Sequence, residues 1–164
     1  MKTLTRYIAA VLIVTFATTA FSCGKNLQKL QDISDELRIH NRNIAQVTND
    51  FHAEGKISNT LHKSVLTAND KISKGITAAN VVIKGARSLS DKSEIRAAWD
   101  EAQRILNHQV WSGFYDIAAA TFDLPAEIKE RYESILAKVR LAFSALRMLL
   151  SQIEAGLREE RYAE

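Results

Sequence analysis

The feature that most constrains this chain is an apolar repeat with helical spacing along almost its whole length. Apolar side chains recur every three or four residues, which is the spacing of one face of an α-helix. The stretches expected to be helical are residues 25–51, 57–89, 91–121 and 125–157. Proline occurs once and glycine six times in 164 residues, so little interrupts the repeat. The sequence therefore predicts an all-α chain.

The connections between these stretches are short. Short connections make neighbouring helices antiparallel, so the expected fold is an antiparallel up-down-up-down four-helix bundle with crossing angles of about +20°. Each helix should bury one apolar seam. The seam expected for the second helix is Leu61, Val65, Ala68, Ile72, Gly75, Ala79, Val82, Ala86 and Leu89.

Local signals mark the helix ends. Gly55 is expected to end the first helix, because glycine readily adopts the left-handed conformation of a C-cap. Residues 91–94 (Asp-Lys-Ser-Glu) have the spacing of a capping box for the third helix. Pro125 fits the first turn of the fourth helix, where a missing N–H is not needed. Gly75 should allow a neighbouring helix to approach closely, and Gly113 should either kink its helix or admit a bulky neighbour.

The beginning of the chain has the composition of a signal peptide. Lys2 and Arg6 are followed by an apolar run from Ile8 to Ala20. That run is shorter than the roughly 20 residues needed to span a bilayer, which favours a cleavable signal peptide. We therefore expect a signal peptide at residues 1–22 and one domain at residues 23–164, which is long enough to bury a core.

The apolar run ends at Ala20-Phe21-Ser22-Cys23, with small residues at positions −3 and −1 before the single cysteine. This arrangement resembles the lipobox of bacterial lipoproteins. The resemblance implies that the Cys23 thiol receives diacylglycerol, that the bond before it is cut, and that the new amine is acylated. It also implies a lipid-anchored envelope protein, and with Gly24 after the cysteine, the periplasmic face of the outer membrane in a diderm host. Two alternatives are a secreted protein with a free thiol and an uncleaved membrane anchor.

Composition argues against several classes of function. The net charge of +3 depends on Lys2 and Arg6, and residues 23–164 carry 20 basic and 19 acidic side chains. A nucleic-acid binder needs a concentrated basic surface, so no nucleic-acid partner is expected. A single cysteine cannot form an internal disulfide or a cysteine-based metal site. No nucleophile elbow, phosphate loop or Ser–His–acid pattern occurs, so we expect neither an enzyme nor a cofactor.

The best candidate site is aromatic. Trp111 can meet Phe114 and Tyr115 at the (i, i+3) and (i, i+4) spacings of a helix. We expect these side chains towards the end of the bundle away from Cys23, as a recognition surface for a partner, as a small apolar pocket, or as the closing layer of the core. The full predicted surface is Trp111, Phe114, Tyr115, Phe122, Phe51 and His52. The leading interpretation is thus a non-catalytic, membrane-anchored envelope lipoprotein with a partner-binding or structural role.

The alternative function is a periplasmic bundle that binds haem or another small ligand. His40 is the polar member of the first seam, and we expect it to be level with residues 146–149, near Met148. A histidine and a methionine on facing helices can hold haem iron. However, di-iron bundles need a Glu-x-x-His motif on two helices, which the chain lacks, so no metal site is expected. A coiled-coil oligomer is a third possibility.

Overall fold

The structure, a computed structural model, describes the backbone of residues 2–159 and the side chains of residues 26, 28–91 and 93–152. Every regular element in that part of the chain is helical, so the all-α prediction is confirmed. The elements are α1 (Lys2–Ala53), α2 (Asn59–Ala86), α3 (Lys92–Ile105), the π-helical segment η1 (Leu106–Trp111), α4 (Ser112–Ala120) and α5 (Ala126–Glu159). Because α3, η1 and α4 follow without a break, they form one rod.

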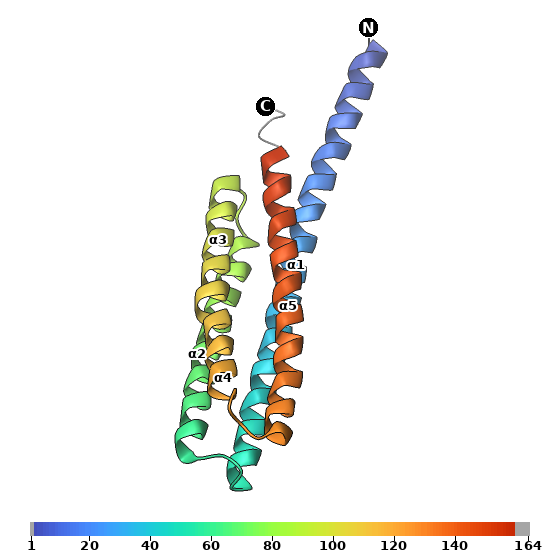
Figure 1. Ribbon diagram of the computed structural model, residues 1–164. Helices are drawn as coiled ribbons and strands as arrows, with labels where there is room; N and C mark the ends of the chain where they lie inside the picture. The colour runs from blue at the N-terminus through green and yellow to red at the C-terminus, as the bar shows by residue number, and fades with distance from the viewer. Residues whose placement is uncertain (1, 160–164) are drawn as a thin grey trace.

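Figure 1 shows the α1–α2 and α4–α5 connections at one end and the α2–α3 connection at the other. This path is compatible with the predicted up-down-up-down order. Helix α2 packs on α1 and on the whole α3–α4 rod, whereas α5 packs mainly on α1. Helix α4 makes few contacts with α5, and α3 makes almost none. The side between the rod and α5 is therefore the loosely packed side of the bundle.

Helix α1 begins earlier than predicted. It runs from Lys2 through Cys23 and Gly24 without a break, whereas the sequence suggested a start at residue 25. A single glycine inside a helix costs only about 1 kcal/mol, which does not stop propagation. No helix in the described part of the chain combines the length and apolarity required to cross a bilayer. The side chain of Cys23 lies outside the described side chains, so its lipidation stays a prediction.

The predicted helix ends at Gly55 and Asp91 are confirmed. Gly55 has φ +68°, its N–H donates to the His52 carbonyl, and the Lys56 N–H donates to the Phe51 carbonyl. These two bonds make a Schellman motif. At the start of α3, Asp91 Oδ1 accepts hydrogen bonds from the N–H groups of Ser93 (2.8 Å) and Glu94 (3.1 Å).

The core follows the predicted seams, but α2 buries more than one. Ile76, Asn80 and Ile83 are buried in addition to most of the predicted positions, whereas Val82 is only half-buried. The reason is the position of α2 between α1 and the α3–α4 rod. A helix with neighbours on two sides must bury a wider stripe than a single heptad seam.

Gly75 and Gly113 lie where α2 and the rod pack tightly against each other. A Cβ on Gly75 would lie 2.8 Å from Val110 Cγ2, and a Cβ on Gly113 would lie 2.5 Å from Ile72 Cγ1. Gly75 therefore allows the close approach that was predicted. Of the two alternatives for Gly113, the structure selects the bulky neighbour, because the irregular turn of this rod is η1 rather than a kink at Gly113.

Candidate functional site

The candidate site begins with the π-helical turn η1, which the sequence did not indicate. A π-turn widens the helix by one residue per turn, and such turns occur frequently at functional sites. In η1 the side chains of Gln109 and Val110 pack against Gly75 of α2. The last residue of the turn, Trp111, points to the other side of the rod, where it meets α5.

Trp111 joins the rod to α5. Its ring packs edge-on against Phe143, with centroids 4.8 Å apart and an interplanar angle of 68°. The guanidinium carbon of Arg147 lies 5.6 Å from the Trp111 ring centroid, within range of a cation–π contact. Phe114 is buried and also meets Phe143, at 6.3 Å. The indole is half-buried, so part of it faces solvent.

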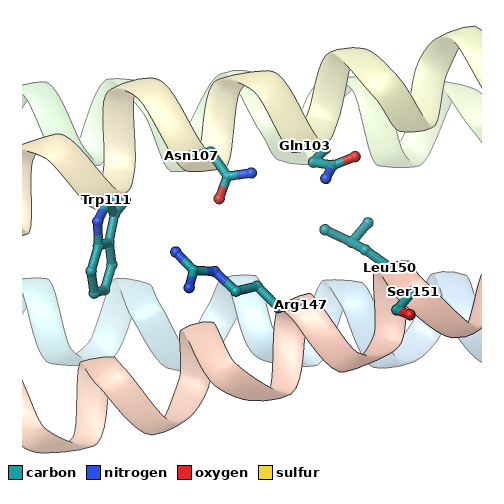
Figure 2. A pocket seen from close by; sticks show the side chains of 6 residues that line it. All are labelled: Gln103, Asn107, Trp111, Arg147, Leu150 and Ser151. Carbon is teal, nitrogen blue, oxygen red and sulfur yellow. The ribbon is translucent and has the colours of Figure 1, made fainter.

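On one side of Trp111 the rod and α5 enclose a hollow of about 360 Å³. Figure 2 shows Gln103 and Asn107 extending from the rod toward Arg147 and Leu150 on α5. The complete lining is Gln103, Asn107, Trp111, Arg147, Leu150 and Ser151. This hollow has two amides, a guanidinium and a hydroxyl around an apolar and aromatic floor.

On the other side of Trp111 lies a smaller hollow of about 60 Å³. Its lining is Trp111, Phe114, Tyr115, Ala118, Leu136, Val139 and Arg140. Tyr115 is 68% exposed and forms the outer edge of this hollow. Because Trp111 lines both hollows, they lie end to end along α5. We call the two together the Trp111 groove.

The charge of the Trp111 groove is positive. Arg140 and Arg147 stand seven residues apart on α5, about 10.5 Å along the same helix face. Among the described side chains, none that lines either hollow is acidic. Among the described residues no carboxylate forms an ion pair with either arginine. The groove therefore offers two guanidinium groups to an anionic ligand.

The structure brings together only three of the six aromatic-site residues predicted from the sequence. Trp111, Phe114 and Tyr115 lie in the groove, opposite the middle of α5 rather than at the end away from Cys23. Phe122 is 66% exposed and lies under Lys129, whose Nζ is 4.3 Å from its ring centroid.

The other two predicted residues are near the α1–α2 connection. Phe51 is 2% exposed and packs on Tyr132, with ring centroids 6.0 Å apart. His52 stacks on His62 at 4.0 Å. Phe51, His52 and Phe122 line neither hollow of the Trp111 groove, so the groove contains only part of the predicted surface. Phe51 and Phe114 fit the alternative in which aromatics fill the core.

The prediction that His40 is level with residues 146–149 of α5 is wrong. The Tyr132 hydroxyl donates to Thr48 Oγ1 at 3.0 Å, which fixes the register of α1 against α5. Accordingly Met148 shares a hollow with Ile33, one heptad before His40, and is 66% exposed. His40 is buried, with its Nε2 3.4 Å from Glu36 Oε1. Among the described side chains, no group of three or more potential metal ligands occurs.

Comparison with protein-family models, with curated proteins and with solved structures finds no significant match for this chain. The geometry of the Trp111 groove is therefore the basis of the functional proposal. The residues that sequence reasoning missed are Gln103, Asn107, Arg140 and Arg147. One signal pointed to the arginines: residues 134–153 contain three basic side chains and no acidic one.

Proposed function

We propose that this protein is a non-catalytic helical bundle of the bacterial envelope, anchored by lipid at Cys23, that binds a protein partner through the Trp111 groove. In this proposal the bundle has up-down-up-down order. The observation that carries it is the gathering of Trp111, Tyr115, Arg140 and Arg147 on the loosely packed side. Tryptophan, tyrosine and arginine are the residue types that contribute most to interface hot spots.

The exposure of these side chains supports a binding role over a purely structural one. Tyr115 is 68% exposed although it is next to a buried phenylalanine, and Trp111 is only half-buried. A partner that covered both rings would bury apolar area worth about 25 cal/mol per Å². Tyrosine and tryptophan also keep a polar group for a hydrogen bond in such an interface.

The proposed anchor gives the groove a definite height above the membrane. Phe143, opposite Trp111, is eleven residues after Tyr132, so the α1–α5 register puts it level with Leu37. Leu37 is fourteen residues beyond Cys23, or about 21 Å along α1. A groove at that height is open to a partner in the periplasm.

The test of partner binding is photo-crosslinking in intact cells. A photoreactive amino acid replaces Tyr115, and a matched control replaces Thr77, which is exposed on α2. A protein captured only from position 115 is identified and purified. Its dissociation constant for the Trp111→Ala/Tyr115→Ala variant should rise by about tenfold or more, with an unchanged helical circular dichroism signal. Identical capture from both positions, or an unchanged dissociation constant, would refute the proposal.

The test of the anchor is separate. Wild-type protein should incorporate labelled fatty acid and stay with the membrane fraction, because two or three acyl chains hold a protein there nearly permanently. The Cys23→Ser variant should incorporate none. Unlabelled wild-type protein in the soluble fraction would favour the secreted alternative, and would leave the groove proposal unaffected.

A further inference from the structure

The structure also indicates what kind of partner fits the Trp111 groove. We infer that its occupant is an amphipathic helix of a protein partner, with carboxylate side chains seven residues apart beside an apolar stripe. This inference rests on the function proposed above and specifies the chemistry of the ligand. It follows from the shape, the charge and the position of the groove.

The shape favours a helix over a small molecule. The lining residues on α5 extend from Leu136 to Ser151, which is about 22 Å or four helical turns. Small-molecule sites enclose most of the ligand surface, whereas both hollows of this groove are partly open to solvent. An elongated groove between two helices, with apolar residues at its floor, suits the helix-in-groove mode of recognition.

The charge selects an acidic helix. Arg140 and Arg147 are one heptad apart, so they project from the same face of α5 at the edge of the groove. A helix lying along α5 presents residues i and i+7 with the same spacing, and carboxylates there would meet both arginines. Gln103 and Asn107, on the opposite wall, add amide groups that can donate hydrogen bonds. Trp111 lies between the two arginines and would contact the apolar stripe.

The position of the groove argues against anionic lipid headgroups as the occupant. With the lipid at Cys23, the α1–α5 register puts Arg140 about 25 Å and Arg147 about 15 Å along α1 from the anchor. These distances are about three and about two times the Debye length of about 8 Å at physiological ionic strength, so screening weakens the membrane surface potential at both arginines. The two arginines are therefore better placed for a partner above the membrane.

A selection experiment tests this inference with the full chain in non-ionic detergent. The probe is a displayed library of 21-residue helical peptides with a fixed leucine stripe and flanking positions randomised among Glu, Gln, Lys and Ser. Against wild-type protein, glutamate should be enriched at two flanking positions seven residues apart. That enrichment should disappear with the Arg140→Gln/Arg147→Gln variant. It should persist with a control, Arg42→Gln/Lys138→Gln, which removes the same charge from exposed positions outside the groove.

The selected peptide is then labelled and its dissociation constant measured by fluorescence anisotropy. Loss of both arginines should weaken binding about tenfold, and replacing both peptide glutamates by glutamine should have the same effect. When the arginines have already been replaced, replacing the peptide glutamates should weaken binding little further, because both changes remove the same ion pairs.

The outcomes separate this inference from the proposed function. If peptides are selected without glutamate enrichment, or none is selected, the acidic-helix inference is wrong, and the crosslinked partner at position 115 still stands. If vesicles of phosphatidylcholine with phosphatidylglycerol bind the protein in an Arg140- and Arg147-dependent way and displace the peptide, the occupant is a lipid surface instead. If no partner is captured at position 115, it is the proposed function that fails.

Discussion

Glycine-to-alanine substitution should stabilise the protein at Gly85 and destabilise it at Gly75 and Gly113, although all three glycines lie within predicted helices. Gly75 and Gly85 are both in α2, and Gly113 is in α4. In an open helix position the change stabilises the fold by about 0.5–1 kcal/mol, because glycine loses more backbone entropy than alanine. A Cβ on Gly85 would have no heavy atom within 4 Å, so Gly85→Ala should show this gain.

At the two packed glycines the new methyl group has no space. On Gly113 it would lie 2.5 Å from Ile72 Cγ1 and 3.3 Å from the Ala68 carbonyl oxygen, well inside the normal carbon contact distance of about 3.5–4.0 Å. On Gly75 it would lie 2.8 Å from Val110 Cγ2. Valine and isoleucine are stiff at χ1, so neither neighbour moves aside easily.

Overpacking of this kind costs about 1–3 kcal/mol, which exceeds the helix-propensity gain. We expect a net loss of about 1–2 kcal/mol for Gly113→Ala and a smaller loss for Gly75→Ala. In a chain of this length each kcal/mol shifts the melting temperature by about 2–4 °C. Both substitutions should also disturb η1 and therefore the position of Trp111.

Guanidinium chloride unfolding followed by circular dichroism at 222 nm measures these differences. The expected order of stability is Gly85→Ala above wild type, then Gly75→Ala, then Gly113→Ala. As an internal check, the loss caused by Gly75→Ala should become smaller in a Val110→Ala background, because the clash with Val110 Cγ2 is then absent and only the 3.1 Å contact with Gln109 Cβ remains. If all three single substitutions stabilised the protein equally, the close approach of α2 to the α3–α4 rod would be wrong.

Two further predictions concern groups with shifted pKa values. Burial raises the pKa of the Tyr132 hydroxyl above its ordinary value of 10.0, opposed by its hydrogen bond to Thr48. Wild-type protein should therefore lose stability as pH rises above 10. The Tyr132→Phe variant should be about 1 kcal/mol less stable at neutral pH but should not show this loss. Denaturant titrations between pH 8 and 11 measure the difference. Hydrogen bonds from the Ser93 hydroxyl, and then from the N–H groups of Glu94 and Ser93, hold the pKa of Asp91 below 3.8. The ionised Asp91 side chain should therefore stabilise α3 above pH 3.8, and this stabilisation should be lost as pH falls through the pKa of Asp91 in the folded protein. Asp91→Ala should reduce the melting temperature at pH 7 but not at pH 2.

The helices and their ends were predictable because the signals are local. The left-handed φ of Gly55 and the cap at Asp91 depend on a few adjacent residues, and the sequence contains them. Pro125 behaves similarly: it directly precedes α5, and its carbonyl accepts hydrogen bonds from the N–H groups of Ile128 and Lys129. Such turns form in the same way wherever the rest of the chain lies.

The π-turn η1 could not be predicted in this way. It contains no glycine or proline, and its Asn, His, Val and Trp are only moderate helix formers, a composition that does not specify a π-turn. The turn coincides with a tight contact between the rod and α2, where Val110 lies over Gly75. The sequence indicates that Gly75 permits the close approach of a neighbouring helix. Which residue packs there depends on the register between α2 and η1, and the residue that does so, Val110, is 35 residues after Gly75.

The same distinction explains which part of the candidate site was found. Trp111, Phe114 and Tyr115 are neighbours within one helical rod, so their spacing alone brought them together. Arg140 and Arg147 were missed because exposed arginines on a helix usually face only solvent. They gain importance because α3 makes almost no contact with α5, which leaves the arginines beside a groove instead of a packed seam.

If a partner helix occupies that groove, α5 gains a second packed face beside the one it shares with α1. The arginines would then select a partner by charge while Trp111 supplies the apolar contact, so charge reversal at residues 140 and 147 should change which helix binds rather than whether the bundle folds.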